Sequence, residues 1–339
     1  MNSPEEQDGK LKTSGAIKQR LLTGVLIIAI LLICLAIWSI YSPNGQGLSS
    51  IFMPSMPDVE FKFAIGGDGS KPDYRMSEPM GVDIADNGDI YVADTLNNMV
   101  KVFDSKGTFK NSFGGKDVFY LPTDLAVTVD SVFVADGKNS RILVFDLSGK
   151  FKRTLAGPEI GKKIGAWMPT AITVSNNGDI YATDVFYHRV IVFDTNGSIK
   201  NQFGVPGNGK GQMMYPNGIA VDNTGTVYVA DSNNGRIQVF DNTGKFVNTL
   251  SENGKDSGFN MPRGLTFGRK NFLYVVETFT HGLKILDVQK DRFVNNTIIG
   301  TRGVGDGEMN FPNDVAIKQN TLCVADRANN RILVYRVSE

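Results

Sequence analysis

The side chains best suited to chemistry in this sequence are acids, amides and two histidines that stand beside turns. Six acids recur about every 45 residues, each at the end of a short apolar run: Asp94, Asp136, Asp184, Asp231, Glu277 and Asp326. Carboxylate oxygens suit calcium. In four copies, however, an Arg follows five residues later, as Arg236 follows Asp231. We therefore expect a structural role, in which each carboxylate pairs with its Arg and accepts loop N–H groups.

A calcium site is the alternative, and it would use oxygen-bearing residues near the start of the repeats and at one strand end. This set is Asp124, Asn217, Glu277, Asn313 and Asp314. Calcium binds oxygen atoms at about 2.3–2.6 Å, so these residues would have to converge on one point. As ordinary strand and turn residues they need no metal. We expect no cofactor, with calcium as the alternative.

The two histidines, His188 and His281, do not complete a recognisable catalytic set. A zinc hydrolase or lyase generally needs three protein ligands. Only Cys323 could join them, and it falls inside a predicted strand. The sequence contains no Gly-x-Ser-x-Gly elbow, no HExxH and no Walker motif. These observations favour a protein that is not an enzyme.

The elements that position these residues form a repeat. Residues 216–250 contain four short strands, at 218–221, 227–230, 236–240 and 246–250, separated by turns rich in Asn and Gly. Six copies align on leading prolines: Pro79, Pro122, Pro169, Pro216, Pro262 and Pro312. A period of about 45 residues is typical of four-stranded propeller blades. The inner strands are apolar almost throughout, as strands buried on both faces must be. The sequence predicts an all-β, six-bladed β-propeller.

The sixth copy has no room for a fourth strand before Glu339. Residues 59–65 form an unattached strand pattern near the other end of the chain. We expect this segment to complete the last blade and close the ring, which hides edges that would otherwise promote aggregation. The predicted propeller therefore spans residues 59–339.

The repeat pattern P-x-G-[IV]-A-V-D, G-x-[IV]-Y-V-A-D-x-x-N-x-R and V-F-D resembles the NHL-repeat six-bladed propellers. The fourth copy, PNGIAVDNTGTVYVADSNNGRIQVFD, follows this pattern nearly throughout. Three copies depart from it: Met99 stands at the Arg position of the first copy, the second lacks the Gly-Asp turn, and in the fifth Gly282 stands at the Arg position and Glu277 replaces Asp. The resemblance covers about residues 59–339 and implies the propeller fold.

One face of such a propeller is expected to bind partners. The connections that enter each first strand lie there with those that join second and third strands, around the channel mouth. The ligand-binding residues predicted on these connections are Tyr74, Arg75, Trp167, Tyr187, His188, Asn217, Arg263, His281 and Asn313. We expect this face to bind a protein, peptide or glycan partner as a scaffold. The alternative is a calcium-dependent hydrolase or lyase in the central channel.

The N-terminal region predicts a membrane anchor. Residues 1–20 form a polar tail, and residues 21–40 run without charge from Leu21 to Ile40, long enough to span a bilayer core. The transmembrane helix is assigned to residues 21–41 and a linker rich in Pro, Gly and Ser to residues 42–58. Lys and Arg precede the apolar run, so the N-terminus is expected in the cytoplasm and the propeller in the periplasm or outside the cell. A cleaved signal peptide is the alternative.

Nucleic acid is not an expected partner. Lys and Arg together number 35, as do Asp and Glu, so the formal net charge is zero. A neutral chain without a basic run provides no general field for phosphate.

Overall fold

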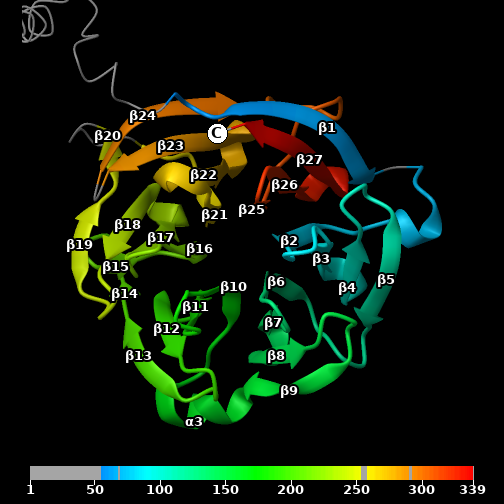
Figure 1. The fold of residues 1–339 in the computed structure, drawn as a ribbon. Coiled ribbons are helices and arrows are strands. Elements are labelled where there is room, and N and C mark those ends of the chain that lie inside the picture. Colours follow the sequence, from blue (N-terminus) through cyan, green and yellow to red (C-terminus); the bar gives the residue numbers. More distant parts are fainter. Residues whose placement is uncertain (1–54, 68, 253–257, 290–291, 339) are drawn as a thin grey trace, which may run out of the picture. The chain divides into compact units, whose positions relative to one another are not determined.

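The structure, a computed structural model, describes residues 55–67, 69–252, 258–289 and 292–338. Six antiparallel sheets surround a central axis, so the described part of the chain is an all-β, six-bladed β-propeller, as predicted (Figure 1). Blades 1 to 5 run outward from the channel in chain order, from a first strand that lines the axis to a fourth strand at the rim, and in blade 6 the fourth strand comes from the N-terminal side of the propeller.

The strands follow the repeat. Blade 1 contains β2 (Pro79–Ile84), β3 (Ile90–Asp94), β4 (Met99–Phe103) and β5 (Phe109–Gly114). Blade 2 contains β6 (Pro122–Val127), β7 (Val132–Asp136), β8 (Arg141–Phe145) and β9 (Phe151–Ala156). Blade 3 contains β10 (Pro169–Val174), β11 (Ile180–Asp184), β12 (Arg189–Phe193) and β13 (Ile199–Phe203). Blade 4 contains β16 (Pro216–Val221), β17 (Val227–Asp231), β18 (Arg236–Phe240) and β19 (Phe246–Thr249).

The last two blades are less regular. Blade 5 contains β21 (Pro262–Phe267), β22 (Phe272–Glu277), β23 (Gly282–Gln289) and β24 (Arg292–Ile299), and β20 (Ser251–Glu252) adds a short parallel strand outside β24. Blade 6 contains β25 (Asp314–Lys318), β26 (Thr321–Asp326) and β27 (Arg331–Ser338), completed by β1 (Asp58–Gly66).

Short elements occupy the connections. They are β14 (Val205–Pro206), β15 (Gln212–Met213), α3 (Gly161–Ile164), and the 3₁₀ turns η1 (Pro72–Tyr74), η2 (Thr95–Asn97), η3 (Gly137–Asn139), η4 (Pro158–Ile160), η5 (Ser232–Asn234), η6 (Arg269–Asn271), η7 (Thr278–Thr280) and η8 (Arg327–Asn329).

The N-terminal strand closes the ring. β1 pairs antiparallel with β27 along its length, from Asp58 opposite Ser338 to Gly66 opposite Arg331, with one bulge. The prediction that residues 59–65 supply the fourth strand of the last blade is confirmed. The first and last strands of the propeller therefore share one sheet, which leaves neither β27 nor β1 as an unpaired end.

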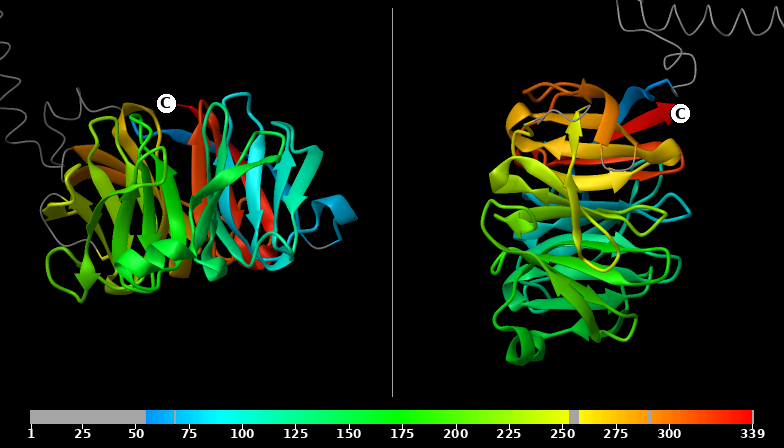
Figure 2. Two further views of the ribbon diagram at one scale, coloured as in Figure 1. Left: turned by 90° about the horizontal axis from the view of Figure 1, so that it is seen from below. Right: turned by 90° about the vertical axis from the view of Figure 1, so that its left-hand side faces the viewer.

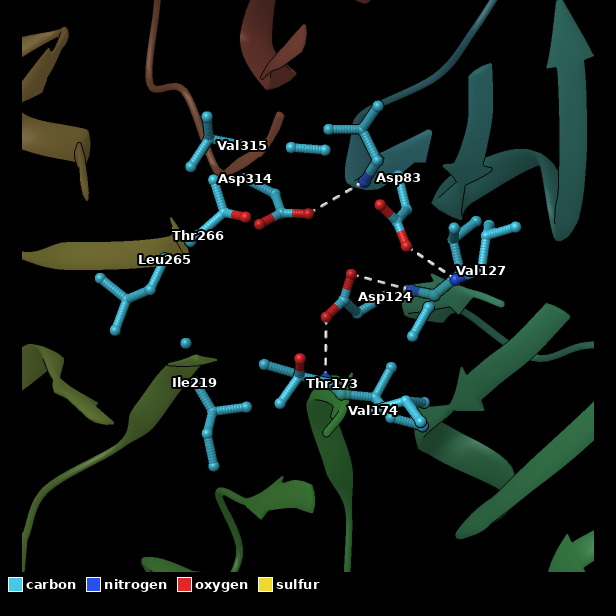
Figure 3. Close-up of a pocket in the computed structure, with 18 of the residues that line it drawn as sticks. Asp83, Asp124, Val127, Thr173, Val174, Ile219, Leu265, Thr266, Asp314 and Val315 are labelled. Carbon is cyan, nitrogen blue, oxygen red and sulfur yellow. Dashed lines mark hydrogen bonds between the residues drawn. The ribbon is translucent and has the colours of Figure 1, made fainter. Parts of the chain in front are cut away.

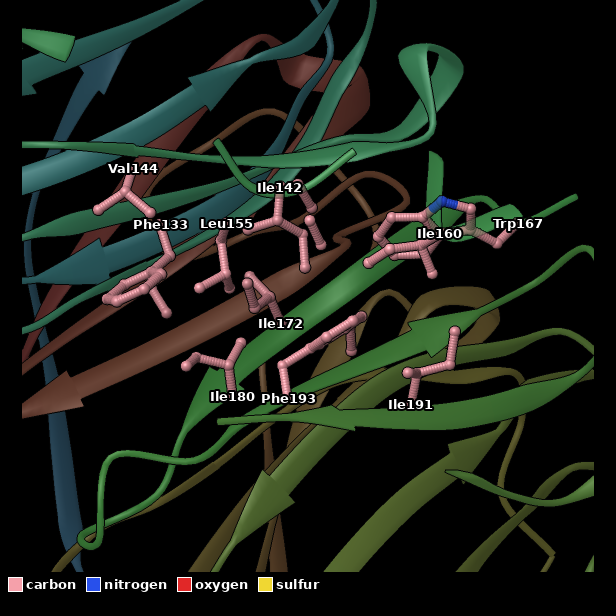
Figure 4. Close-up of a cluster of buried hydrophobic side chains, with 14 residues drawn as sticks. Phe133, Ile142, Val144, Leu155, Ile160, Trp167, Ile172, Ile180, Ile191 and Phe193 are labelled. Atoms are coloured by element: carbon pink, nitrogen blue, oxygen red, sulfur yellow. The ribbon is translucent and has the colours of Figure 1, made fainter. Parts of the chain in front are cut away.

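A hydrophobic cluster fills each of the six seams between neighbouring blades. The seam between blades 2 and 3 is typical: Ile142, Ile172, Ile191 and Phe193 interlock there with Trp167 (Figure 4). Inner strands such as β7 are buried at every position, whereas the outer strand β5 alternates partly buried and exposed residues. Burial of apolar surface on both faces of each sheet is the main stabilising term of the ring.

The two faces of the ring carry different connections, and Figure 2 gives the side views. The tight turns within hairpins, such as that from Asp222 to Gly225 with its positive φ, lie on one face. The connections into first strands and the corners between second and third strands lie on the other, because in blades 1 to 5 the blade proline pairs with the acid that ends the second strand, as Pro216 does with Asp231. We call this second side the loop face.

The predicted membrane helix, residues 21–41, lies outside the described residues. Within the part of the chain that the structure describes, no helix has the length and apolar character needed to cross a membrane.

Candidate binding face

The six strand-end acids are structural, as the repeat predicted. The predicted ion pairs form between Asp136 and Arg141 (2.7 Å), Asp184 and Arg189 (2.9 Å), Asp231 and Arg236 (2.7 Å), and Asp326 and Arg331 (2.8 Å). Asp231 is fully buried and also accepts the backbone N–H of Met214 at 2.6 Å. Each carboxylate thus ties its corner to the connection that enters the same blade.

The two blades without the Arg use a lysine two positions further along the third strand. In blade 1, Lys101 Nζ lies 3.8 Å from Asp94 and donates to the carbonyls of Asp73 and Arg75. In blade 5, the equivalent Lys284 packs over the rings of Phe259 and Phe293. Burial raises the pKa of the Glu277 carboxyl, and Lys284 opposes that shift only in part.

The histidines join neighbouring blades. His188 Nδ1 accepts the backbone N–H of Tyr215 at 2.9 Å, and His281 Nδ1 accepts that of Phe311 at 3.1 Å. Asn98 and Asn330 occupy the same left-handed corner position and accept the equivalent N–H with their side-chain oxygens. Burial lowers the pKa of His281, with Arg302 adding to the effect. The histidines therefore act as amide substitutes in a structural joint.

The predicted residues gather at two junctions. At the junction of blades 3 and 4, His188 stacks edge-on against Tyr215, Asn217 Nδ2 donates to the Tyr215 carbonyl, and Tyr187 lies under the guanidinium of Arg189. Phe186 packs against Tyr187 and is 59% exposed. This junction presents aromatic rings to solvent.

The junction of blades 5 and 6 combines aromatic rings with positive charge. Arg263 Nη1 donates to Asn313 Oδ1 at 2.7 Å, and Asn313 Nδ2 donates to the Met80 carbonyl of blade 1. Phe311 contacts the rings of both His281 and Phe279. The structure thus brings Arg263, His281 and Asn313 onto one sector of the loop face.

Three predicted ligand residues lie elsewhere. Trp167 is only 2% exposed and belongs to the seam between blades 2 and 3, so it is not a surface residue. A connection rich in Lys and Gly suggested exposure, but the indole fills the space beside Phe193. Tyr74 packs against Phe103 and Phe109 of blade 1, and Arg75 Nε is bonded to the Ser70 carbonyl.

The central channel holds a cavity of about 200 Å³ lined by all six first strands. Asp83, Asp124 and Asp314 project into it (Figure 3). Their carboxylates accept backbone N–H groups from the next blade: Asp314 from Val82 (2.9 Å), Asp83 from Val127 (2.7 Å) and Asp124 from Ile172 (2.8 Å). The three acids therefore fasten blades 6, 1, 2 and 3 to one another along the channel wall.

Enclosure by protein favours the protonated form of these acids. Burial raises the pKa of Asp83 to about 6 and that of Asp314 to about 7, where Asp83 adds to the effect. The pKa of Asp124 is raised well above its usual value by burial and then by Asp314. At least one proton is expected to remain on this cluster near neutral pH.

The residues of the calcium alternative are not assembled in one place. Asp124 and Asp314 line the channel, whereas Asn313 bonds to Arg263 and Asn217 to the Tyr215 carbonyl. Glu277 accepts the N–H of Asn260 at the end of its own strand. Among the residues described, no group of three or more His, Cys, Asp or Glu side chains is arranged to hold a metal ion.

The sequence analysis missed three features of this site: the acid Asp83, the lysines Lys101 and Lys284, and the rings Phe279 and Phe311. Asp83 was detectable as a lone acid inside an otherwise apolar first strand. Lys101 and Lys284 were detectable because both blades that lack the Arg carry a lysine seven residues after the acid. Phe279 and Phe311 gave no comparable signal, since their contact depends on how two blades meet.

Comparison with known families defines the repeat. The NHL-repeat model matches residues 213–240 and 309–335, which lie in blades 4 and 6. The chain is a six-bladed β-propeller, and two of its blades match the NHL repeat. It is 31% identical over 137 residues to Protein brain tumor of Drosophila melanogaster; the match covers 38% of this chain and 13% of that protein's length.

Solved structures of low identity share the fold. A Bacteroides thetaiotaomicron protein of unknown function is 13% identical with a TM-score of 0.68, covering 83% of this chain and 76% of that one. Virginiamycin B lyase from Staphylococcus aureus is 17% identical with a TM-score of 0.56, covering 83% of this chain and 99% of the lyase. At these identities the likeness concerns architecture alone.

Proposed function

We propose that this protein is a membrane-anchored binding or scaffolding module, displayed outside the cytoplasm, whose loop face holds a protein, peptide or glycan partner. The observation that carries this proposal is the concentration of exposed apolar rings and chains on that face. Leu96, Tyr120, Phe186, Tyr187, Tyr215 and Phe279 are each 42–59% exposed there. Large aromatic side chains are common anchors of protein interfaces.

The partner test uses the full chain in its native membrane. A Phe186→Ser/Phe279→Ser variant removes two rings from the loop face, and Val129→Ser removes an exposed side chain from the opposite face. Cross-linking should capture a partner with the wild type and with Val129→Ser, and lose it with the double variant. Equal capture by all three proteins would contradict a role for the loop face.

The membrane location has a separate test. The apolar run at residues 21–40 supports the anchor, and the preceding Lys and Arg residues support the orientation. A Val129→Cys variant places a thiol on an exposed turn. A reagent that cannot cross membranes should label it in intact cells or spheroplasts; labelling only after lysis would refute the proposed location.

A calcium-dependent hydrolase or lyase is the second proposal, supported by the channel cavity with Asp124 and Asp314 in its wall. It is weakened by the N–H groups that Asp124 already accepts from Leu125 and Ile172. Millimolar calcium should raise the melting temperature if the channel binds it. An unchanged melt would remove this proposal.

A further inference from the structure

We propose that the loop face at blades 5 and 6 binds an acidic peptide segment of the partner, with Arg263 as the carboxylate receptor and Phe279 and Phe311 as an apolar wall. This inference rests on the binding function proposed above and specifies the chemistry of the partner.

Arg263 combines a largely buried guanidinium with the lack of a carboxylate partner among the described residues. No described carboxylate lies within ion-pair distance of it. Its Nη1 bonds to a neutral amide oxygen of Asn313, and its Nε is buried without an acceptor. By contrast, Arg331 donates to Asp326 and to the carbonyls of Val304, Gly305 and Glu308.

The surroundings of Arg263 add positive charge. Burial and, to a smaller extent, the charge of the nearby Arg327 together lower its pKa to about 10. Arg327 itself reaches only Glu78, at 3.8 Å, on a half-exposed side chain. In the same sector, the positive charge of Arg302 lowers the pKa of His281. The guanidiniums of Arg263 and Arg327 repel each other, so an anion bound beside them would be stabilised by both charges.

The adjoining rings define what kind of anion fits. Phe279 is 54% exposed, and its ring centroid lies 6.2 Å from that of Phe311 at an edge-to-face angle. A carboxylate can take two parallel N–H bonds from a guanidinium fork. An Asp or Glu beside an apolar residue therefore satisfies both parts of the site.

A nucleic acid fits this sector less well than a peptide does. A phosphate backbone requires a track of cations, whereas this sector has one desolvated Arg, and acids such as Glu78 and Asp306 stand on the same face. Because the chain is neutral as a whole, no wider field compensates for these acids.

The test pans a phage library of random twelve-residue peptides against the full-length wild type and ranks the enriched peptides by affinity. Enriched peptides should carry Asp or Glu next to an apolar residue. Arg263→Met should weaken them by at least about tenfold, because a desolvated charge pair is lost. Arg263→Lys should recover binding only in part, since lysine lacks the fork.

Arg269→Met is the matched control. It removes the same charge from the hairpin turn η6, on the face opposite the loop face, and should leave affinity unchanged. Wild-type melting of Arg263→Met shows that its defect is not misfolding. A random twelve-nucleotide RNA pool is titrated in parallel, and Arg263-dependent binding of RNA in place of peptide would overturn the inference.

The outcomes separate the two proposals. Enriched peptides without acids, or acidic peptides that bind Arg263→Met equally well, overturn this inference but leave the loop face as a binding surface. Absence of any enriched peptide that competes with the native partner contradicts the inference and the peptide-binding function together. If Arg263→Met still binds the native partner while Phe186→Ser/Phe279→Ser does not, the loop face is a binding surface but Arg263 is not its carboxylate receptor.

Discussion

Blades 4 and 5 are neighbours built on the same repeat, yet they treat their buried charges differently. In blade 4, Asp231 meets Arg236, Asn234 and the N–H of Met214. In blade 5, Glu277 has no arginine, because Gly282 stands in its place, and the guanidinium of Arg263 bonds to the amide of Asn313 with no described acid in ion-pair distance. Blade 4 follows the repeat and satisfies the polar groups of its corner, whereas blade 5 departs from it and leaves Glu277 without an arginine and Arg263 without a described acid.

The largest expected difference in stability between the two blades comes from removing their strand-end acids, Asp231 and Glu277. Asp231→Ala leaves Arg236 without its counter-ion in a buried corner and should cost about 3–5 kcal/mol of unfolding free energy. Glu277→Ala loses one long N–H bond and should cost about 1 kcal/mol. Denaturant unfolding of both variants measures the difference, and equal losses would abolish the distinction between the blades.

The substituting lysines give the next largest effect. Lys101 bonds to two carbonyls besides facing Asp94, so Lys101→Met should destabilise the protein by about 2–3 kcal/mol. Lys284 lies mainly over aromatic rings, so Lys284→Met, which keeps that apolar contact, should cost about 1 kcal/mol or less. A larger loss from Lys284→Met would mean that Glu277 is as tightly paired as Asp94.

The channel acids predict a pH dependence. Because the pKa values of Asp83 and Asp314 rise to about 6 and about 7, the folded state holds protons that the unfolded state has released. Their contribution to stability is therefore greatest at about pH 4 and is lost as the pH rises towards about 7.

Asp314→Asn should reduce this slope by up to about 1.4 kcal/mol per pH unit, the contribution of one proton. Asp117→Asn, which changes an exposed acid outside the channel, is the control. Melting curves between pH 4 and pH 8 measure the effect; an unaltered slope in Asp314→Asn would show that this acid does not hold a proton in the folded state.

The smallest expected effect concerns the joints between blades. His281→Ala leaves the Phe311 N–H without its acceptor and should cost about 1 kcal/mol. His281→Asn should be nearly neutral, because Asn330 performs the same task where blade 6 meets blade 1. If His281→Asn is as destabilising as His281→Ala, the histidine has a role beyond this joint.

The fold was predictable because the same strand and turn pattern occurs six times in the sequence. The prolines, the strand-end acids and the strand β1 that completes blade 6 follow from patterns visible in the sequence. The site was predictable only in part. Arg263 and Asn313 were selected for their position after a proline, but their contact and the lack of a described acid beside Arg263 depend on how separate blades meet. Trp167 shows the reverse, because a residue in a polar connection turned inward to fill a seam.

The pairing of β1 with β27 also sets an order of events during synthesis. The strand made first must wait for the strand made last before either has its partner, so the ring cannot be completed until the whole propeller is available. A chain interrupted before β27 would keep five blades and an unpaired β1, whose open edge would compete with the native β1 for β27 of a complete molecule.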